Sequence, residues 1–295
     1  MKIVIGLPAY NEEKNIAAII LKLKKITDTI IICNDGSTDL TSEIAEKMGA
    51  IVVNHSKNLG YGAAIRSIFS KAKELKSDIL VTFDADGQHR VEDISMVAEP
   101  IEKNEADIVI GSRFLNNDDS QVPGYRKAGI KAITAVANTS IESKLTDSQS
   151  GFRAYSIKVI NELTPSEFGM GVSTEILIKA NKLGLRIKEV PITVSYEGDT
   201  STHNPVSHGV SVLLGTMKFI SIEHPLKFYG LPGLVFLGIG LFFTVWTIQE
   251  FTLTRQIITN IALIGIGTIL IGTVLMVTSI MLYSLVNVVR EGRRD

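Results

Sequence analysis

The chain has 295 residues, and its 30 basic and 31 acidic residues leave a formal net charge of −1 at pH 7. A balance this close to zero gives no electrostatic reason to expect nucleic acid as a partner. The single cysteine, Cys33, excludes an intramolecular disulfide and fits a reducing cytoplasm. Met1–Leu7 is too short an apolar stretch for a secretion signal, because polar residues follow within a few positions.

The N-terminal part of the chain alternates apolar runs with segments of helical spacing. Strands are predicted from the apolar runs at Lys2–Leu7, Thr29–Cys33, Ala50–Val53 and Ile79–Phe83. Helices are predicted from the apolar spacing at Asn15–Lys25, Thr41–Met48, Gly62–Lys76 and from Glu175 to Leu183. This alternation indicates an α/β sheet, in which ligand sites gather at the carboxyl ends of the strands.

Two long uncharged runs occupy the C-terminal part of the chain. Asp, Glu, Lys and Arg are absent from Phe228 to Ile248 and again from Gln256 to Val289. Each run is long enough for a helix of roughly 20 residues to cross the hydrocarbon core of a bilayer. The alternative is a pair of buried core helices, but such helices are usually shorter and carry a polar face. We therefore predict two transmembrane helices in an integral membrane protein.

Basic residues flank the two predicted spans unevenly. The intervening loop carries only Arg255, whereas the outer flanks carry Lys218, Lys227, Arg290, Arg293 and Arg294. Positive charge on the outer flanks predicts that the N-terminal domain and both termini face the cytoplasm. His208–His224 has helical spacing and is either an interfacial helix or an ordinary helix packed on the sheet. The predicted organisation is a domain at 1–207, a juxtamembrane helix at 208–227 and a two-helix anchor at 228–295.

Three polar clusters follow predicted strands, at 8–12, 34–39 and 84–89, and are expected to meet in one crevice. In the third cluster Asp84, Asp86 and Gln88 alternate, so an extended backbone presents three hard oxygen ligands on one side. We predict Mg²⁺ or Mn²⁺ there, with the rest of its coordination shell supplied by a diphosphate and water. A bare Asp-x-Asp is more often a solvated turn or a helix cap, but its position after a buried strand favours the metal.

The first two clusters suit a nucleoside. Asp35 stands at the tip of a strand, where a carboxylate can bind ribose hydroxyls or the edge of a base. Tyr10 offers an aromatic face to a nucleobase. Each cluster also has a purely local interpretation, because Ser37, Thr38 or Asp39 can cap the next helix, and 8–12 can simply end a strand.

In this order and spacing, the three clusters resemble the inverting glycosyltransferase family 2, whose GT-A domain shows a Pro-Ala-Tyr-Asn-Glu opening, an Asp-Gly-Ser-x-Asp turn and an Asp-x-Asp metal site. The chain is similar to the dolichyl-phosphate mannose or glucose synthase branch through its motifs at 58–62, 84–89, 111–114 and 147–153. The resemblance implies an α/β fold: a Rossmann-like GT-A domain that binds a nucleotide-sugar, followed by two C-terminal transmembrane helices.

The resemblance also implies roles for individual residues. The implied nucleotide-sugar pocket is lined by Pro8, Tyr10, Glu12, Asp35 and Asp84, and the implied metal ligands are Asp84, Asp86 and Gln88. Arg113 and Arg126 would act with Asp86 in catalysis by engaging phosphates of the donor and the lipid, because a guanidinium fork matches phosphate oxygens. The alternative for each arginine is an exposed surface position, and for 147–153 a structural role is equally well supported.

The implied reaction moves a hexose from a donor of the GDP-mannose or UDP-glucose type to a polyprenyl (dolichyl) phosphate, in one displacement with inversion. A lipid phosphate is already an anionic nucleophile, so this reaction requires no dedicated base. Glu175 could serve as one, but an acid in a first helical turn is favoured by the helix dipole anyway.

One loop departs from the mannose synthase pattern, because 196–205 is polar and carries His203 where those enzymes have a basic residue. The donor sugar therefore stays open, and so does the oligomeric state. His89, His203 and His208 are more often hydrogen-bonding loop residues than metal ligands. The alternative functions are a processive polysaccharide synthase, transfer to another lipid or glycan acceptor such as diacylglycerol or ceramide, and a non-catalytic protein that binds nucleotide-sugars at the membrane.

Overall fold

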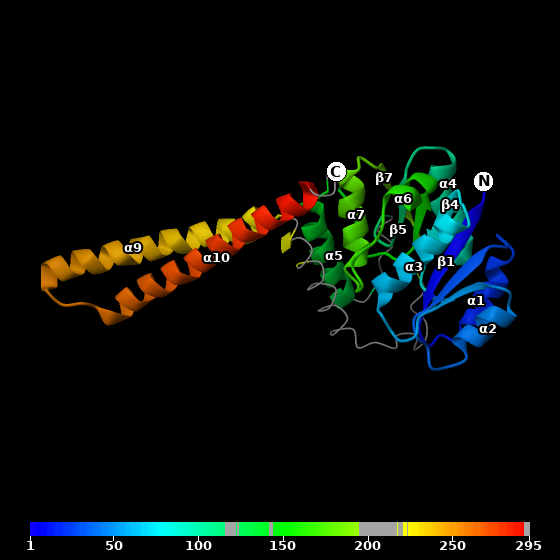
Figure 1. Cartoon of the computed structure of the whole chain (residues 1–295), viewed down its shortest axis with the longest axis horizontal. Coiled ribbons are helices and arrows are strands. Elements are labelled where there is room, and N and C mark those ends of the chain that lie inside the picture. The colour runs from blue at the N-terminus through cyan, green and yellow to red at the C-terminus, as the bar shows by residue number, and fades with distance from the viewer. Residues whose placement is uncertain are drawn as a thin grey trace. The chain divides into compact units, whose positions relative to one another are not determined.

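The computed structural model in Figure 1 describes residues 1–115, 122, 124–141, 144–194, 217, 221–222 and 224–291. The chain divides into two compact units, Met1–Thr216 and Met217–Asp295. The predicted helix at His208–His224 lies mostly outside the described residues, as does the predicted boundary between 207 and 208. Each unit is described below by itself.

The first unit is built on a sheet of seven strands in the order β3-β2-β1-β4-β6-β5-β7. The strands are β1 (Ile3–Ala9), β2 (Ile30–Asn34), β3 (Ile51–Asn54), β4 (Ile79–Thr82), β5 (Ile108–Ser112), β6 (Arg153–Ser156) and β7 (Ile187–Pro191). All neighbouring pairs are parallel except those of β6, which runs antiparallel to both β4 and β5. The predicted α/β sheet is confirmed, with its four predicted strands as β1 to β4.

Helices cover both faces of this sheet (Figure 1). They are α1 (Ile16–Leu23), α2 (Thr41–Lys47), α3 (Tyr61–Glu74), the short η1 (Val91–Asp93), α4 (Ile94–Glu102), α5 (Gly124–Asn138), α6 (Ile157–Glu162) and α7 (Val172–Lys182). Apolar side chains of α1, α2 and α4 form one core with alternate residues of β1, β2 and β4. On the other face α3 packs closely on β1, because Gly6 has no side chain to keep Ile68 away.

Because β6 runs antiparallel to β5, the segment between these two strands starts and ends at the same edge of the sheet. β5 ends at Ser112, and β6 begins at Arg153, which pairs with Ile110 of β5. The chain segment 113–152 therefore leaves the sheet and returns to it at the same edge. That edge also holds the carboxyl ends of β1, β2 and β4, because these strands run parallel to one another and antiparallel to β6.

The second unit contains two long helices that follow the one-turn π-helix η3 (Leu226–Gly230): α9 (Leu231–Thr254) and α10 (Thr259–Glu291). Small residues line the contact between them. A Cβ atom on Gly240 would lie 2.5 Å from Ile269, and one on Gly272 would lie 2.9 Å from the carbonyl oxygen of Gly233. Such close approach of backbones is how helices pack in lipid, where burial of apolar surface gives no driving force.

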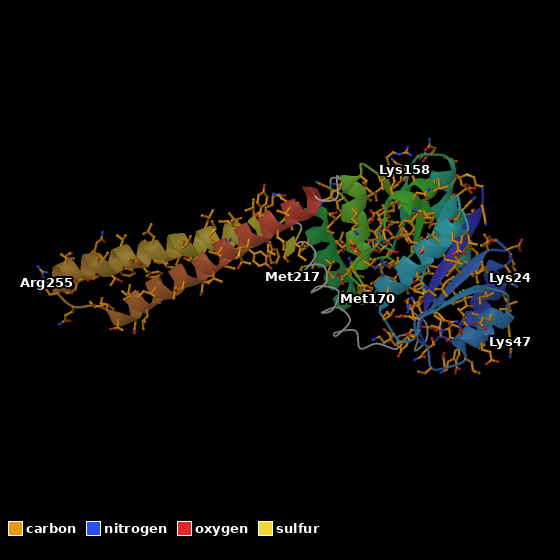
Figure 2. All side chains as sticks on the ribbon, viewed as in Figure 1. Lys24, Lys47, Lys158, Met170, Met217 and Arg255 are labelled. Atoms are coloured by element: carbon orange, nitrogen blue, oxygen red, sulfur yellow. The ribbon has the colours of Figure 1, made fainter. Side chains whose placement is uncertain are left out.

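Large apolar side chains cover the outside of α9 and α10, and Figure 2 shows them projecting along both helices, with Arg255 at the turn. Both helices, taken as 226–254 and 259–288, are long and apolar enough to cross a membrane, and only 11% of the apolar window of each is buried within the chain. They are therefore not a buried core pair of this unit. The prediction of two long apolar C-terminal helices is confirmed.

Candidate active site

The carboxyl ends of β1, β2 and β4 lie side by side and bring the three polar clusters together. Pro8 of β1 pairs with Cys33 of β2, and Gly6 of β1 pairs with Thr82 of β4. The segments that follow, 10–13, 35–40 and 83–89, consequently leave the sheet at one edge. The expected convergence of these clusters is what parallel pairing of neighbouring strands produces.

Reciprocal hydrogen bonds join the loop after β1 to the loop after β2. The Asn11 amide N–H donates to Ser37 Oγ at 2.9 Å, and the Thr38 amide N–H donates to Asn11 Oδ1 at 2.9 Å. Three further bonds run between the two loops: Glu12 N to Thr41 Oγ1, Glu13 N to Asp39 Oδ2 and Leu40 N to Glu13 Oε2. The polar side chains of 37–41 therefore fix the shape of this edge, beyond any local capping of α2.

Asp35 is deeply buried at the end of β2. Its Oδ1 accepts from His55 Nδ1 at 2.6 Å and from the Leu59 amide at 2.9 Å, and its Oδ2 accepts from the Gly60 amide at 2.8 Å. The carboxylate thus holds the loop before α3 against β2. Gly60 has φ +99°, and a Cβ there would lie 2.6 Å from the carbonyl oxygen of Phe168, so this tight loop requires glycine.

Pro8, Tyr10 and Glu12 are half-buried along the same edge. The Glu12 carboxylate accepts from Asn15 Nδ2 at 2.9 Å. Burial raises the pKa of Glu12, the bond from Asn15 opposes that rise, and the negative charges of Asp86 and Asp39 add to it. Glu12 and Asp86 are therefore close enough to repel each other, which places the end of β4 beside the loop after β1.

Asp84 lies just beyond β4 in a confined position, with 37% of its side chain exposed. A Cβ on Gly151 would lie 3.0 Å from both carboxylate oxygens and 2.7 Å from the Tyr61 hydroxyl, so only glycine lets the backbone before β6 pass here. Burial raises the pKa of Asp84, while a hydrogen bond from Tyr61 and the charges of Arg113 and Arg153 act to lower it. Its buried Oδ1 has no hydrogen-bond partner among the described residues.

These residues suit a hard divalent cation. Asp86 Oδ1 accepts from the Gln88 amide N–H at 3.0 Å, so the backbone curls tightly after Asp84. Within the described residues no three His, Cys, Asp or Glu side chains converge as a complete metal centre. Two carboxylates, one of them with an unsatisfied oxygen, and an amide oxygen are the partial donor set that Mg²⁺ or Mn²⁺ completes with phosphate and water.

Arg113 follows β5 and forms a bidentate pair with Asp147. Its Nε donates to Asp147 Oδ2 at 2.6 Å, and its Nη2 donates to Asp147 Oδ1 at 2.8 Å. Asp147 is fully buried; burial alone would raise its pKa, but the charge and hydrogen bonds of Arg113 hold the pKa below its usual range. Arg113 is 17% exposed and contributes positive charge near Asp84. Arg126 belongs to α5, and its side chain lies outside the described residues.

The residues of the motif at 147–153 mainly make structural contacts within the chain. Arg153 is buried, and its guanidinium donates to the carbonyl oxygens of Ser150, Ser173 and Ser148 at 2.8, 2.9 and 2.7 Å. Asp147 positions Arg113, as described above. These contacts support the alternative of a structural role for this segment.

Glu175 is also fully occupied by structural contacts. Its carboxylate accepts from the backbone N–H groups of Ser166 and Glu167 and from the Ser166 hydroxyl, and it pairs with Lys179 at 2.7 Å. It anchors the loop before α7. Sequence reasoning missed Glu189, which accepts from the Thr146 and Asp147 amides and so fixes the partner of Arg113.

His89 is buried between aromatic rings beside Asp84. Its ring centroid lies 6.2 Å from that of Phe83 and 5.3 Å from that of Phe152, and its Nε2 is 3.9 Å from Asp84 Oδ2. Burial, helped by the charge of Arg113, lowers the pKa of His89 to about 3, so the imidazole is neutral. His203 and His208 lie outside the described residues.

Residues 4–164 match the model of the family described as Glycosyl transferase family 2. The chain belongs to this family. Among its family 2 relatives is a UDP-N-acetylglucosamine–dolichyl-phosphate N-acetylglucosaminyltransferase of Methanococcus voltae, 35% identical over 72% of this chain and 91% of the relative. A dolichyl-phosphate hexose transferase of Haloferax volcanii is 30% identical over 74% of this chain and 93% of its own length. The rest of this chain has no aligned counterpart in these two proteins.

Solved structures agree with the fold of the first unit. Glucosyl-3-phosphoglycerate synthase from Mycobacterium tuberculosis, in complex with Mn²⁺ and UDP-glucose, matches with a TM-score of 0.59 at 22% identity, over 75% of this chain and 78% of the synthase. The predicted GT-A-like α/β domain is therefore confirmed, and this family 2 glycosyltransferase carries two long apolar helices after it.

Proposed function

We propose that this protein transfers a sugar from a nucleotide diphosphate sugar to a polyprenyl phosphate of the dolichyl type at the cytoplasmic face of a membrane. The observation that carries the proposal is the position of Asp84 and Asp86, which follow β4 beside the loops after β1 and β2, with Asp84 close to the charge of Arg113. The two relatives named above act on dolichyl phosphate by their names, which supports the choice of acceptor.

The donor is proposed to lie along the edge where β1, β2 and β4 end. Pro8, Tyr10, Glu12 and Asp35 would border its nucleoside, and Asp84 would lie near the ribose. The loops at 10–13 and 35–40 are already joined by hydrogen bonds, so the pocket needs little ordering when the nucleotide arrives. The sugar is either a hexose or an N-acetylhexosamine.

Asp84, Asp86 and Gln88 would hold the divalent cation. When bound, Mg²⁺ or Mn²⁺ supplies stabilisation of the negative charge that develops on the departing diphosphate. The chain itself contributes the orientation of these oxygens, because the tight turn at 86–88 and the glycine at 151 restrict where the carboxylates can go.

The arginines are proposed to bind phosphate groups. Asp147 fixes the guanidinium plane of Arg113 while part of this side chain remains exposed, and a fixed fork loses less entropy when it binds an anion. Arg126 of α5 is the proposed partner of the lipid phosphate. An anionic acceptor attacks the anomeric carbon directly, with inversion, so the structural engagement of Glu175 is compatible with this reaction.

The second unit would anchor the enzyme where its acceptor resides. Tyr229, just before α9, and Trp246, in its second half, are about 26 Å apart at 1.5 Å per residue. Aromatic rings favour the two interfaces of a bilayer, whose hydrocarbon core is about 30 Å thick. The basic flanks of the two helices support a topology in which both ends of the chain, and the catalytic unit with them, face the cytoplasm.

A transfer assay tests the proposal. The detergent-purified full chain receives a polyprenyl phosphate and, one at a time, radiolabelled UDP-glucose, UDP-N-acetylglucosamine and GDP-mannose, with Mg²⁺, Mn²⁺ or EDTA. We expect one donor to label a mild-acid-labile lipid, with the label lost in EDTA and in Asp86→Ala. Glu92→Ala is the matched control, because Glu92 is an exposed carboxylate nearby.

Two results would count against the proposal. If protein that binds nucleotide and metal labels no polyprenyl phosphate with any donor, the acceptor assignment is wrong, and diacylglycerol and ceramide become the acceptors to assay. If labelling persists in Asp86→Ala and in EDTA, the proposed metal site is wrong.

A further inference from the structure

The hydrogen bonds of Asp35 leave it with little capacity for a ligand. A carboxylate offers about four acceptor positions, two on each oxygen. Oδ1 already receives two donors, His55 Nδ1 and the Leu59 amide, whereas Oδ2 receives one, the Gly60 amide. Among the described residues, one acceptor position therefore stays open, and it lies on Oδ2.

His55 is the side chain that sets this arrangement. It follows β3, and its backbone N–H donates to the carbonyl oxygen of Asn34 at 2.9 Å, which holds it beside the end of β2. Because the Asp35 carboxylate only accepts, His55 Nδ1 donates to it. The other ring nitrogen, Nε2, lies 2.8 Å from Ser67 Oγ of α3 and 3.6 Å from Cys33 Sγ. Both ring nitrogens are thus engaged, and the imidazole links α3 to Asp35 without rotational freedom.

We propose that His55 is a positioning residue of the nucleoside subsite, which orients Asp35 so that a single acceptor position on Oδ2 meets the nucleobase. The inference rests on the proposed function, because it takes Asp35 as a group that borders the nucleoside. His55 itself touches neither nucleotide nor metal and acts through Asp35.

A single acceptor position selects between nucleobases. Uracil presents one imino N–H at its pairing edge, whereas guanine presents an imino N–H and an amino group side by side. One open position on Oδ2 satisfies the uracil edge and leaves one guanine donor without a partner, and an unpaired buried donor lowers affinity. The subsite therefore takes a uridine diphosphate sugar in preference to a guanosine diphosphate sugar.

Calorimetric titration of UDP and of GDP into the detergent-purified full chain with Mn²⁺ tests this inference without any acceptor. We expect wild-type protein to bind UDP at least roughly tenfold more tightly than GDP, the factor for one unpaired donor. In His55→Leu the affinity for UDP falls roughly tenfold, as expected for the loss of a bond to a charged group, and the preference for UDP narrows. His55→Asn, whose amide can still donate, restores part of the affinity.

Kinetics separates positioning from a general structural defect. With the donor sugar that the transfer assay identifies, His55→Leu raises the donor KM and leaves kcat nearly unchanged. Ser67→Ala, which removes only the contact of Nε2 with the Ser67 hydroxyl, has a smaller effect in the same direction and serves if His55→Leu does not fold. Ser56→Ala, an exposed neighbour, matches wild type in both assays.

Equal or tighter binding of GDP by wild type would overturn the inference, as would unchanged UDP affinity in folded His55→Leu. These failures are distinct from failure of the proposed function. If the protein prefers UDP in this pattern but labels no polyprenyl phosphate, the inference stands and the proposed acceptor is wrong. If the protein uses GDP-mannose to label the lipid, the proposed function stands and the inference is wrong.

Discussion

The two units of this chain use glycine for different purposes. In the first unit Gly60 and Gly151 let backbone pass within contact distance of polar groups, the carbonyl of Phe168 in one case and the carboxylate of Asp84 in the other. In the second unit Gly240 and Gly272 let one apolar helix touch another. The same absence of a side chain serves a polar site in one unit and helix packing in the other.

The difference extends to where polar and apolar groups lie. The first unit buries most of its large apolar side chains and pairs buried charges such as Arg113 with Asp147. The second unit exposes its large apolar side chains and keeps small residues at the helix contact, where Ser279 donates to the carbonyl oxygen of Pro225 at 3.1 Å. This inversion is what water around the first unit and lipid around the second would produce.

The polar site lies in the first unit, so we expect the reaction to take place there. Asp86→Ala is the variant with the largest expected effect on that reaction. We expect kcat/KM to fall by roughly three to four orders of magnitude, because metal stabilisation of a leaving group contributes several kcal/mol. Steady-state transfer assays over a metal titration measure the loss. Glu92→Ala should stay within about twofold of wild type, since exposed ion pairs contribute little. A small effect of Asp86→Ala would mean that the chemistry lies elsewhere.

The buried ion pair gives the next largest effect. Arg113→Met leaves the fully buried Asp147 without its partner and should cost about 3 to 4 kcal/mol of unfolding free energy. Thermal unfolding followed by circular dichroism measures the change. The double variant Arg113→Met, Asp147→Leu removes both charges and should recover most of the stability. If the single variant is as stable as wild type, buried charge pairing does not characterise the first unit.

Gly240→Leu tests the packing in the second unit. A side chain at this position would collide with Ile269, and overpacking should cost about 2 kcal/mol. Gly238→Leu is the matched control, because Gly238 lies on the same helix with nothing within 4 Å of its Cβ position. Fluorescence of the single tryptophan, Trp246, reports unfolding of the helix pair in detergent. Equal stability of both variants would show that the glycine contact does not hold the helices together.

The buried thiol of Cys33 makes the unfolding free energy of the first unit depend on pH, because its ionisation would bury a charge. This is the smallest of the expected effects. Burial, helped by the charge of Asp35, raises the pKa of this thiol to about 12. The folded protein therefore keeps the proton that the unfolded chain loses above about pH 9, so the stability from this group is complete below that pH and declines as pH rises toward 12. Between about pH 8 and pH 10 we expect wild type to lose about 1.4 kcal/mol more than Cys33→Ala does. Parallel pH curves would contradict this.

Three of the parallel strands, β1, β2 and β4, were predictable because they are buried on both faces. β2 at Ile30–Asn34 is a continuous apolar run apart from its last residue, and the strand predicted at 29–33 is shifted from it by one residue. The two C-terminal helices were equally clear, because an uncharged apolar run of such length is seldom found in a soluble protein. The residues that gather where β1, β2 and β4 end were also identified from the sequence.

Other features left no local signal. β6 has only four residues, Arg-Ala-Tyr-Ser, and its buried arginine donates to three carbonyl oxygens, those of Ser148 and Ser150 just before it and that of Ser173 further along the chain. The pairing of Arg113 with Asp147, and the occupation of the Glu175 carboxylate by backbone, depend on contacts that no spacing in the sequence encodes. Sequence patterns identified the polar residues, but which of them contact each other depends on tertiary packing.

The segment 113–152 starts and finishes at neighbouring positions, because β6 returns antiparallel to β5. It is therefore a cassette, a contiguous segment whose two ends are held at adjacent positions by β5 and β6. It includes both arginines that we assign to phosphates, while the loops assigned to the nucleoside lie elsewhere in the chain. Exchange of this cassette between related enzymes could change acceptor preference and leave donor preference intact, so that the two specificities could evolve, or be engineered, independently.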